Sequence, residues 1–542
     1  MGSPRVTVRL AGARWARLAA LLSVLPLFGW LSVRSGQDAN WDLKNYHFYN
    51  AWAFLEHRLE IDLLPAQAQT FFNPILDLPF YWLVTHSSPR TVGFVLGALH
   101  GLNFWVLYLI GRELLPRSVR ARSLIALLAA GVGFFGPVGT GELGGTKNDN
   151  LAGLWVLAGV YVLVRGLRRR APGGAPASRQ VLASAALVGA GVGLKYSQVP
   201  YAFGLLVALA LAGGDARSRL TRTALGALGT GTGFLLTAGP WMVRIWHRFA
   251  SPLFPFLNSW FQSPYYHSGT SWNDHRWWPE STLEWALRPF YFVSADYGSM
   301  EYPFRDLRFA ILALLIAVAV AARLLTRRGS APDRGPAGRR SGLLPLLCFA
   351  VVSFAAWEAL LSYYRSLYPL EALAPILIAA LALEIVRRPG WSEAAAVALL
   401  LAIALYVQPA DFERIPWGDS FFGVEVPAEP DLSHAVVVLA SEEPTGYLLP
   451  FFPPGPRFVH VASNFTGPQD SNRFEEEIRD LLTSHRGPLF VLYEEPEDAG
   501  RLAAYEIAIE RDSCLPIESR LGTPPPLLCR AHRLPTSEDA HE

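Results

Sequence analysis

The sequence carries little charge and few cysteines for its length. Only 17% of its 542 residues are charged and 51% are hydrophobic, whereas charged residues make up roughly 25% of a soluble domain. This balance excludes a purely soluble protein and an intrinsically disordered one. Three cysteines are too few for a disulfide scaffold or a zinc cluster. A formal net charge of +2 gives no basic excess that would indicate nucleic acid as a partner.

Long apolar runs are abundant. Because a helix needs about 20 apolar residues to span a bilayer, the sequence predicts an all-α polytopic membrane protein. About eleven transmembrane helices are expected, near residues 16–33, 92–111, 121–139, 151–166, 181–194, 199–212, 223–246, 308–325, 343–361, 366–386 and 392–408. The runs 181–194 and 199–212 are short, and they form either one hairpin or two packed helices. The run 74–86 is too short to cross and is interpreted as an interfacial or re-entrant helix.

Arginines gather in alternate loops of this arrangement, for example within 5–17, 112–122 and 217–222. By the positive-inside rule these loops face the cytoplasm. We therefore expect a multi-pass protein of the bacterial cytoplasmic (inner) membrane, with its N-terminus inside and its C-terminus outside. Residues 1–408 would form the membrane domain, with outside loops at 34–91 and 247–307.

Residues 409–542 are polar, and acidic residues outnumber basic ones there by more than two to one. The runs 435–439, 458–461 and 489–493 predict strands, and 472–485 predicts a helix. This segment is therefore expected to be a small extracytoplasmic α/β domain. Its two cysteines, Cys514 and Cys529, would pair if the compartment is oxidising.

Two carboxylates, Asp38 and Asp42, open the first outside loop. Residues four apart share a helix face, so these side chains would converge if the segment is helical. One carboxylate would then act as general base on an acceptor hydroxyl while the other orients it. The alternative is a solvated helix cap followed by an interfacial aromatic belt that includes Tyr46.

Three further outside segments carry cations beside apolar runs. Residues 144–150 include Lys147 and Asp149, Lys195 lies between two short spans, and Arg365 lies between two longer ones. Both ammonium and guanidinium groups bind phosphate. The alternatives are a helix cap at Asp149, a lysine that snorkels to the interface, and an interfacial arginine–tyrosine belt.

Lysine is scarce, and its positions are informative. The only lysines are Lys44, Lys147 and Lys195, all in predicted outside segments. Since arginine serves elsewhere, their retention indicates a need for a compact, strongly hydrated ammonium. Arg276, in the aromatic-rich second outside loop, is a further candidate for contact with hydroxyls or phosphate. The alternative there is an amphipathic loop that lies on the bilayer.

On these residues, the chain resembles the GT-C superfamily of integral-membrane glycosyltransferases. The resemblance is to the polyprenyl-phosphate-sugar-dependent kind, which includes mannosyl- and aminoarabinosyltransferases. Asp42, with Tyr46 four residues later, is similar to the aspartate-bearing first loop of these enzymes. Residues 72–82 resemble their juxtamembrane helix, 146–150 their polar Asp-containing turn, and 362–375 their outer Arg-Tyr-x-x-Pro region.

The resemblance covers residues 1–410 and departs from the family pattern at two positions. Asn73 stands where a basic residue often precedes the proline, and Leu43 stands where a second acidic residue often follows the first-loop aspartate. We therefore carry over no metal and expect no cofactor.

The resemblance implies transfer of a sugar from a polyprenyl-phosphate-linked donor at the outer membrane face. The acceptor would be a hydroxyl of a lipid, glycan or protein, and Asp42 would be the general base of an inverting reaction. The other roles implied are phosphate stabilisation by Lys195, Arg365 and Lys147, orientation by Asp38 and Asp149, and substrate contact by Lys44, Tyr46 and Arg276.

Two alternatives to this enzyme remain open. A lipid-linked glycan transporter or flippase would have charges midway through its spans, broken helices and repeat symmetry. In this sequence the polar residues collect at one face, which favours surface chemistry. An O-antigen polymerase or ligase also works in outside loops, and its donor would carry a whole glycan instead of one sugar.

Overall fold

The computed structural model describes residues 4–168, 176–295, 298–327, 342–428, 430–494, 496–522 and 524–534. The chain folds into two compact units. Unit 1 consists of residues 1–36, 93–239 and 274–412, and unit 2 consists of residues 37–92, 240–273 and 413–542.

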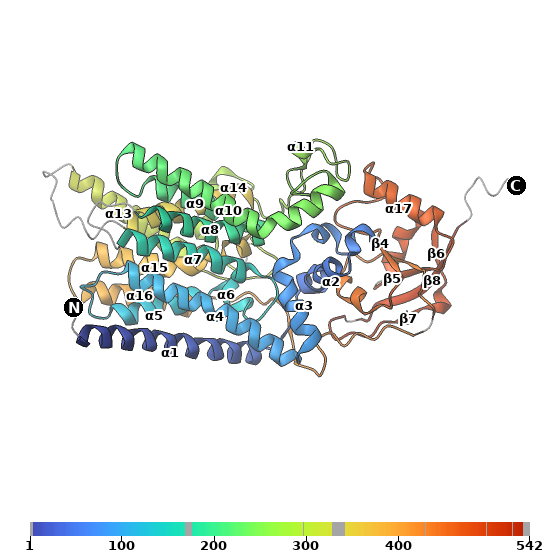
Figure 1. The fold of residues 1–542 in the computed structure, drawn as a ribbon, viewed down its shortest axis with the longest axis horizontal. Helices are drawn as coiled ribbons and strands as arrows, with labels where there is room; N and C mark the ends of the chain where they lie inside the picture. The colour runs from blue at the N-terminus through green and yellow to red at the C-terminus, as the bar shows by residue number, and fades with distance from the viewer. Residues whose placement is uncertain are drawn as a thin grey trace. The chain divides into compact units, whose positions relative to one another are not determined.

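Unit 1 is built almost entirely from helices, many of which run side by side (Figure 1). They are α1 (Pro4–Ser35), α4 (Pro89–Leu114), α5 (Arg122–Phe134), α6 (Pro137–Gly141), α7 (Asp149–Arg168), α8 (Ser178–Leu194), α9 (Val199–Ala210), α10 (Ala216–Phe249), α12 (Thr282–Tyr291), α13 (Arg308–Arg327), α14 (Leu343–Leu360), α15 (Tyr368–Ile385) and α16 (Trp391–Tyr406). The start of α4 (89–92) and the end of α10 (240–249) belong to unit 2. Ten of the eleven predicted segments each coincide with one of these helices, whereas the segment predicted at 121–139 is interrupted at 135–136 and is divided between α5 and α6. The two short runs are separate helices, α8 and α9.

Several of these helices are suited to a membrane. Within the residues that the structure describes, five segments are long and apolar enough to cross one: α4, α7, Arg308–Leu325 of α13, α14, and Tyr364–Ile385, which contains α15. The same residues include five shorter apolar helices. The protein is therefore a multi-pass membrane protein, as the sequence predicts, while the number of crossings stays a prediction.

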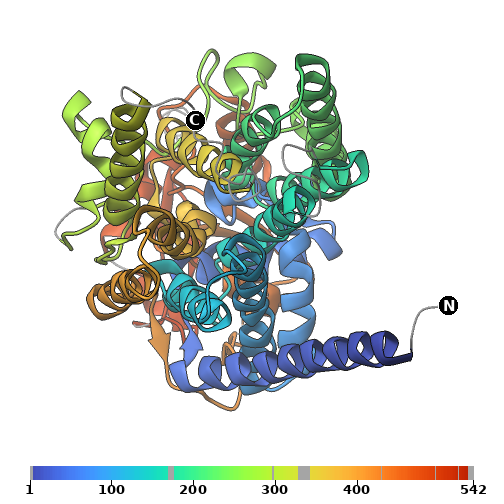
Figure 2. The ribbon, with the colours of Figure 1, turned by 90° about the vertical axis from the view of Figure 1, so that its left-hand side faces the viewer.

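The helix α15 lies at the centre of unit 1, where it packs against α5, α7, α13, α14 and α16 (Figure 2). Close packing against α5 depends on Gly133, because a Cβ at this position would lie 2.3 Å from the carbonyl oxygen of Ala372. Small residues commonly allow membrane helices to approach in this way. The core of unit 1 is thus fixed around a helix that begins three residues after Arg365.

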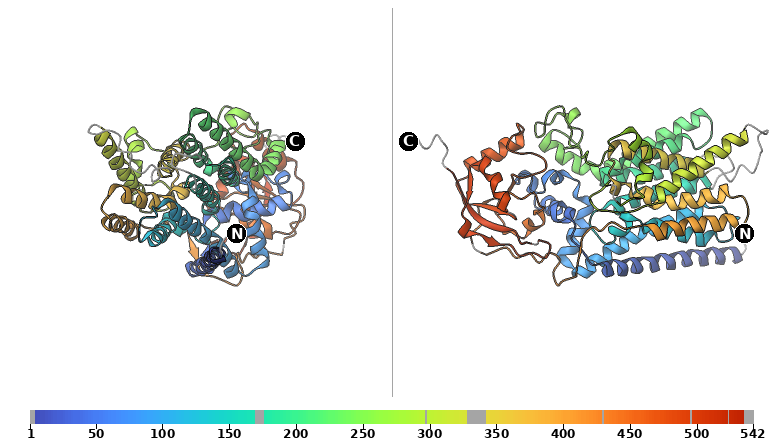
Figure 3. Two further views of the ribbon diagram at one scale, coloured as in Figure 1. Left: turned by 60° about the vertical axis from the view of Figure 1, so that its left-hand side comes forward. Right: turned by 180° about the vertical axis from the view of Figure 1, so that it is seen from behind.

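Unit 2 contains a mixed sheet with the strand order β4-β3-β5-β8-β6, and β7 pairs with β8. Its strands are β3 (Val436–Leu439), β4 (Arg457–His460), β5 (Leu489–Tyr493), β6 (Ile507–Ile509), β7 (Leu515–Pro516) and β8 (Leu527–Arg533). The strand β3 pairs in parallel with β4 and β5, whereas β8 is antiparallel to β5, β6 and β7. Helix α17 (Arg473–Ser484) completes the α/β arrangement (Figure 3). The three predicted strands and the predicted helix are confirmed.

Parts of both long loops pack with this sheet. Phe71, from the first loop, meets the ring of Phe249 edge to face and stacks on that of Phe474, with ring centroids 4.9 and 5.6 Å away. Leu63 forms a parallel bridge to Val459 in β4. Residues 37–92 and 240–273 therefore share one hydrophobic core with the C-terminal segment.

The first loop itself contains short helices and one short strand. They are β1 (Gln37–Asp38), the π-helix η1 (Leu43–His47), α2 (Phe48–Leu55), the 3-10 turns η2 (Arg58–Glu60), η3 (Gln67–Phe71) and η4 (Pro74–Leu76), and α3 (Asp77–His86). The strand β1 pairs antiparallel with β2 (Arg414–Ile415). The helix predicted at 74–86 is present as η4 and α3, and its position at an interface stays a prediction.

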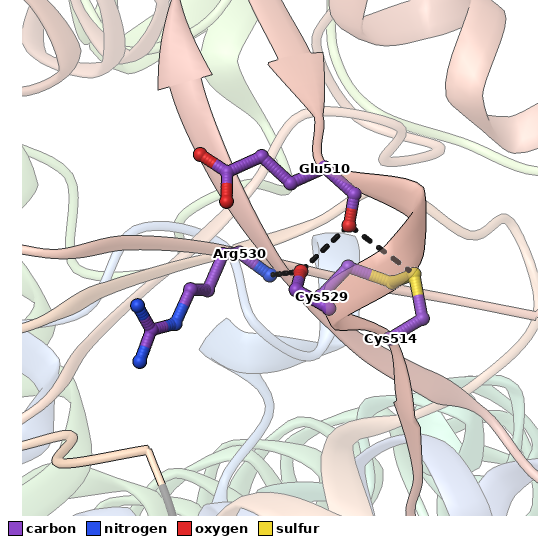
Figure 4. The surroundings of a disulfide bond; sticks show 5 residues. Glu510, Cys514, Cys529 and Arg530 are labelled. Carbon is purple, nitrogen blue, oxygen red and sulfur yellow. Dashed lines mark hydrogen bonds between the residues drawn. A yellow bond between two sulfur atoms is a disulfide. The ribbon is translucent and has the colours of Figure 1, made fainter.

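A disulfide joins Cys514 and Cys529 (Figure 4). The nearby Ser513 hydroxyl donates to the carbonyl of Glu510 at 2.6 Å and accepts the backbone N–H of Arg530 at 2.8 Å. The disulfide thus links the turn before β7 covalently to the central part of β8. A disulfide of this kind is typical of proteins exposed to an oxidising compartment.

Candidate functional site

Three side chains from distant parts of the sequence meet at one buried carboxylate of unit 1. The Asp149 Oδ2 atom lies 2.7 Å from Lys195 Nζ and 2.8 Å from Arg365 Nε. The side chain of Asp149 is 1% exposed, whereas those of Lys195 and Arg365 are 20% and 10% exposed. One carboxylate therefore holds two cations, and the trio retains a net positive charge.

Helix ends bring the three residues together. Asp149 begins α7, Lys195 directly follows α8, and Arg365 lies in the 3-10 turn η7 (Tyr364–Leu367) before α15. Pro200 and Pro369 occupy the first turns of α9 and α15, where a proline is tolerated because that N–H has no intrahelical partner. The chain therefore turns at these points and presents both cations at the end of the bundle where α7 starts.

A second buried carboxylate, Glu142, belongs to the same cluster and was not among the residues predicted from the sequence. Its Oε2 atom accepts the backbone N–H of Asn150 at 3.1 Å, and the residue is 1% exposed. Burial, together with the negative charge of Asp149, raises the pKa of Glu142 well above its usual value. The sequence feature that could have identified Glu142 is its position as a lone glutamate within a glycine-rich apolar stretch. Ionisable residues in such a setting are costly and usually functional.

The turn that carries Asp149 is anchored to α4. His100 Nδ1 accepts the backbone N–H of Gly144 at 3.0 Å, and Asn103 donates its side-chain amide to the carbonyl of Asn150 at 3.1 Å. Asn148 adopts a left-handed conformation with φ of 65°, which asparagine tolerates better than most residues. The turn is therefore a fixed platform.

Lys147 lies in the same turn but is 3% exposed. Its ammonium lies 4.8 Å from the ring centroid of Phe412 and 5.6 Å from that of Tyr302, which is the geometry of cation–π contacts. Its backbone carbonyl accepts a hydrogen bond from Lys195 Nζ at 2.6 Å. Lys147 thus helps to position Lys195, and its predicted contact with phosphate stays a prediction.

The turn that carries Arg365 is held by a buried ion pair. The Tyr364 hydroxyl donates to Asp306 Oδ2 at 2.6 Å, and Asp306 Oδ1 accepts from Arg308 at 2.9 Å. The side chains of Asp306 and Arg308 are both 0% exposed. These residues, which the sequence analysis also missed, fix the backbone next to Arg365.

Arginines gather at the other end of α7. Arg168 donates to the backbone carbonyls of Arg112 and Leu115 at 3.4 and 3.1 Å. The 20 residues of α7 rise about 30 Å, so this group lies far from Asp149. A group of arginines at one end of the helices is what the positive-inside rule predicts for the cytoplasmic side, and the orientation itself stays a prediction.

Asp38 and Asp42 lie in unit 2, where the expected shared helix face is absent. Asp38 belongs to β1, with Arg414 as its register partner, and its Oδ1 accepts from the Asn40 side chain at 2.6 Å. Asp42 immediately precedes the π-helix η1 and is 8% exposed. The helical expectation is wrong because strand pairing with a segment far along the chain overrides the local spacing.

The π-helix that follows Asp42 carries the other first-loop candidates. Lys44 pairs with Glu413 at 3.6 Å, and Tyr46 is a buried ring whose centroid lies 5.5 Å from that of Phe72. His47 Nδ1 lies 2.7 Å from Asp77 Oδ1, and both side chains are buried. Short π-helical segments occur frequently at functional sites.

Arg276 is a surface residue of unit 1. Its Nη2 atom lies 2.7 Å from Oδ2 of Asp274, two residues earlier in the chain, and the Arg276 side chain is 67% exposed. Such exposed pairs contribute little to stability. The structure thus brings together Asp149, Lys195, Arg365 and the backbone of Lys147 in unit 1, and Asp38, Asp42, Lys44 and Tyr46 along one segment of unit 2.

Among the residues that the structure describes, no three His, Cys, Asp or Glu side chains are grouped so that they could hold a metal ion. The expected absence of a cofactor stays a prediction.

No protein-family model matches the sequence, and a comparison with curated proteins found no match. Among solved structures, the chain is similar to the oligosaccharyltransferase of Archaeoglobus fulgidus in its apo form, with 14% identity and a TM-score of 0.46 over 90% of this chain and 71% of that one. It is also similar to the oligosaccharyltransferase AglB of the same archaeon, in complex with an inhibitory peptide and a dolichol-phosphate, with 14% identity and a TM-score of 0.43 over 91% and 71%.

A third similar structure is ArnT from Cupriavidus metallidurans bound to undecaprenyl phosphate, with 11% identity and a TM-score of 0.48 over 96% of this chain and 98% of that one. These proteins are GT-C glycosyltransferases, the superfamily that the motifs of the sequence resemble.

Proposed function

We propose that this protein transfers a sugar from a polyprenyl-phosphate-linked donor to an acceptor hydroxyl, at the outer face of the bacterial cytoplasmic membrane. The observation that carries the proposal is the convergence of Lys195 and Arg365 on the buried Asp149 at one end of a bundle of apolar helices. A lipid-linked phosphate ester is a ligand that combines a long apolar chain with a compact anion. The cationic trio matches the anion, and the neighbouring apolar helices match the chain.

The two cations have complementary roles in this proposal. The Lys195 ammonium contacts the carboxylate of Asp149 and the backbone carbonyl of Lys147. These two contacts fix the direction of its third N–H bond, which would donate to the phosphate. Arg365 is held by Asp149 through Nε, so its guanidinium orientation is set before any ligand arrives. Preorganised charges of this kind stabilise a leaving phosphate without the cost of reorganisation.

Asp42 is proposed as the general base. The acceptor oxygen forms a bond to the anomeric carbon while Asp42 takes the hydroxyl proton, and the bond from that carbon to the phosphate oxygen breaks. The electron pair leaves with polyprenyl phosphate, and attack opposite the leaving group inverts the anomeric centre. The position of Asp42 at the start of a π-helix supports a functional role.

The disulfide supports an outer location for this chemistry. Cys514 and Cys529 are bonded, and disulfides persist in oxidising compartments such as the bacterial periplasm. The chemistry of unit 2 would accordingly be extracytoplasmic, and the arginines around Arg168 would face the cytoplasm.

A purified full-length protein in lipid nanodiscs tests the proposal. It would be incubated with a panel of polyprenyl-phosphate monosaccharides, and released polyprenyl phosphate would be measured. We expect release with at least one donor, and we expect the Asp42→Asn variant to lower the rate by about 10²- to 10⁴-fold while polyprenyl phosphate still binds. Turnover of the variant at the wild-type rate would exclude Asp42 as the base.

The same preparation separates the alternatives. A transporter or flippase would move a labelled lipid-linked glycan across vesicles without releasing polyprenyl phosphate. A polymerase or ligase would release it only from donors that carry a whole glycan. The placement of Asp149, Lys195 and Arg365 at helix ends instead of mid-span favours the monosaccharide transferase.

A further inference from the structure

The C-terminal segment of unit 2 touches the backbone that carries Asp42. We propose that residues 413–422 and 446–451, together with Arg520, act as a positioning clamp for the Asp42 segment, and that Gly446 is the positioning residue at its centre. The proposal rests on the role of Asp42 in the proposed function. It also gives the acidic C-terminal domain a task in catalysis.

Gly446 begins the 3-10 turn η8 (Gly446–Phe451), which packs against the π-helix η1. A Cβ at position 446 would lie 2.0 Å from the backbone oxygen of Asn45 and 3.6 Å from Tyr49 Cβ. Contacts as short as the first do not occur in proteins, so any larger residue would push the π-helix away. Asn45 is only three residues beyond Asp42, and the displacement would reach the carboxylate.

A second set of contacts with the C-terminal segment lies just before Asp42. The strand β1 pairs with β2, and the backbone N–H of Ala39 donates to the carbonyl of Glu413 at 3.2 Å. The buried Gln37 donates to the carbonyl of Phe421 at 2.5 Å and accepts from Arg520 at 3.1 Å. The residues on the N-terminal side of Asp42 are therefore fixed by main-chain and side-chain bonds to the C-terminal segment.

A third set of contacts with the C-terminal segment follows the π-helix. The ring of Phe48 lies 4.4 Å from that of Phe422 and 5.8 Å from that of Phe451, measured between centroids. Phe48 is 2% exposed. The Asp42 segment is thus held on both sides and in its middle by one domain, which is the arrangement expected of a support for a catalytic group.

The direct test compares Gly446→Ala with Gly467→Ala in the full-length protein. Gly467 belongs to the same unit, but a Cβ there would meet nothing within 4 Å, so its variant controls for the loss of a glycine. We expect Gly446→Ala to speed hydrogen exchange in residues 37–50 and to lower kcat by about 10- to 100-fold. KM and the affinity for polyprenyl phosphate should stay at the wild-type values, since the donor cations are untouched.

A second variant tests the clamp independently, in case Gly446→Ala fails to fold. Arg520→Lys keeps the charge but shortens the reach to Gln37 and removes the planar fork, so faster exchange in residues 37–50 and a smaller fall in kcat are expected. Unchanged exchange in both variants, or faster exchange with unchanged kcat, would overturn the clamp. If the wild type transfers no sugar from any donor, the proposed function fails, and the exchange measurements alone then decide whether Gly446 positions this segment.

Discussion

Lys195 Nζ lies 2.7 Å from Asp149 Oδ2, inside a cluster from which solvent is almost excluded at the carboxylate. Arg365 reaches the same oxygen from another part of the chain. The carboxylate therefore fixes two cations that would otherwise repel each other. A phosphate group that arrives at this end of the helices meets charges that are already in place.

Removal of either cation should weaken phosphate binding. We expect Lys195→Ala and Arg365→Ala each to reduce the affinity for polyprenyl phosphate by about tenfold or more, because a charge-assisted hydrogen bond contributes about 1.5–3 kcal/mol. Titration with polyprenyl phosphate in nanodiscs measures the effect. Arg323→Gln is the matched control, since Arg323 forms an exposed pair with Glu384 away from the cluster. Equal losses in all three variants would contradict a specific role.

Glu142 should make stability depend on pH. Its pKa is raised in the folded protein by burial and by Asp149, so the folded state retains a proton that the unfolded chain loses near its ordinary value of 4.5. The stabilisation is therefore complete below that value and is lost as the pH rises toward the folded-state pKa. Thermal unfolding across this range should show the decline, and Glu142→Gln should flatten it. An unchanged profile in the variant would exclude Glu142 as its source.

His460 should produce the opposite dependence in unit 2. Burial lowers the pKa of its imidazole from 6.5 to about 4, and its Nε2 lies 2.8 Å from the carbonyl of Ser441. The unfolded chain therefore binds a proton first as the pH falls. Stability is complete above pH 6.5 and declines by roughly 3 kcal/mol as the pH approaches 4. Denaturant unfolding at several pH values tests this, and His460→Gln, which preserves the donor to Ser441, should remove most of the slope.

The disulfide should protect two of the three cysteines from alkylation. Before reduction, only Cys348, which is free and partly buried, is available for labelling in the solubilised protein. Mass spectrometry should show that Cys514 and Cys529 label only after reductant is added. Replacement of both by serine should lower the stability of unit 2 by about 3 kcal/mol, because the bridge closes a loop with a sequence separation of 15. Labelling of all three thiols without reductant would contradict the bond.

The helices and the sheet could be predicted because their signals are local. Apolar runs of the right length mark each helix of unit 1 from α1 to α16 that the sequence analysis expected. The strands β3, β4 and β5 are short β-branched or aromatic runs, and α17 has a clear polar–apolar period. Each of these patterns can be read within a single window of the chain.

The parts that could not be predicted depend on partners far away in the sequence. Asp38 joins a strand only because Arg414 lies opposite it, and nothing near Asp38 reveals this. Glu142 gains its importance only where the turn brings it to Asp149. The positions of Asp149, Lys195 and Arg365 beside apolar runs made them candidates in the sequence, but their shared contact required the packing of α7, α8 and α15.

The pairing of β1 with β2 also constrains the order of events during synthesis. The strand β1 follows α1, near the beginning of the chain, and β2 follows α16. The Asp42 segment cannot acquire its partner until the last helix of unit 1 and residues 414–415 have left the ribosome. An incompletely translated chain that ends before these residues would therefore lack the β1–β2 pair, and the segment around Asp42 would complete its fold late in synthesis.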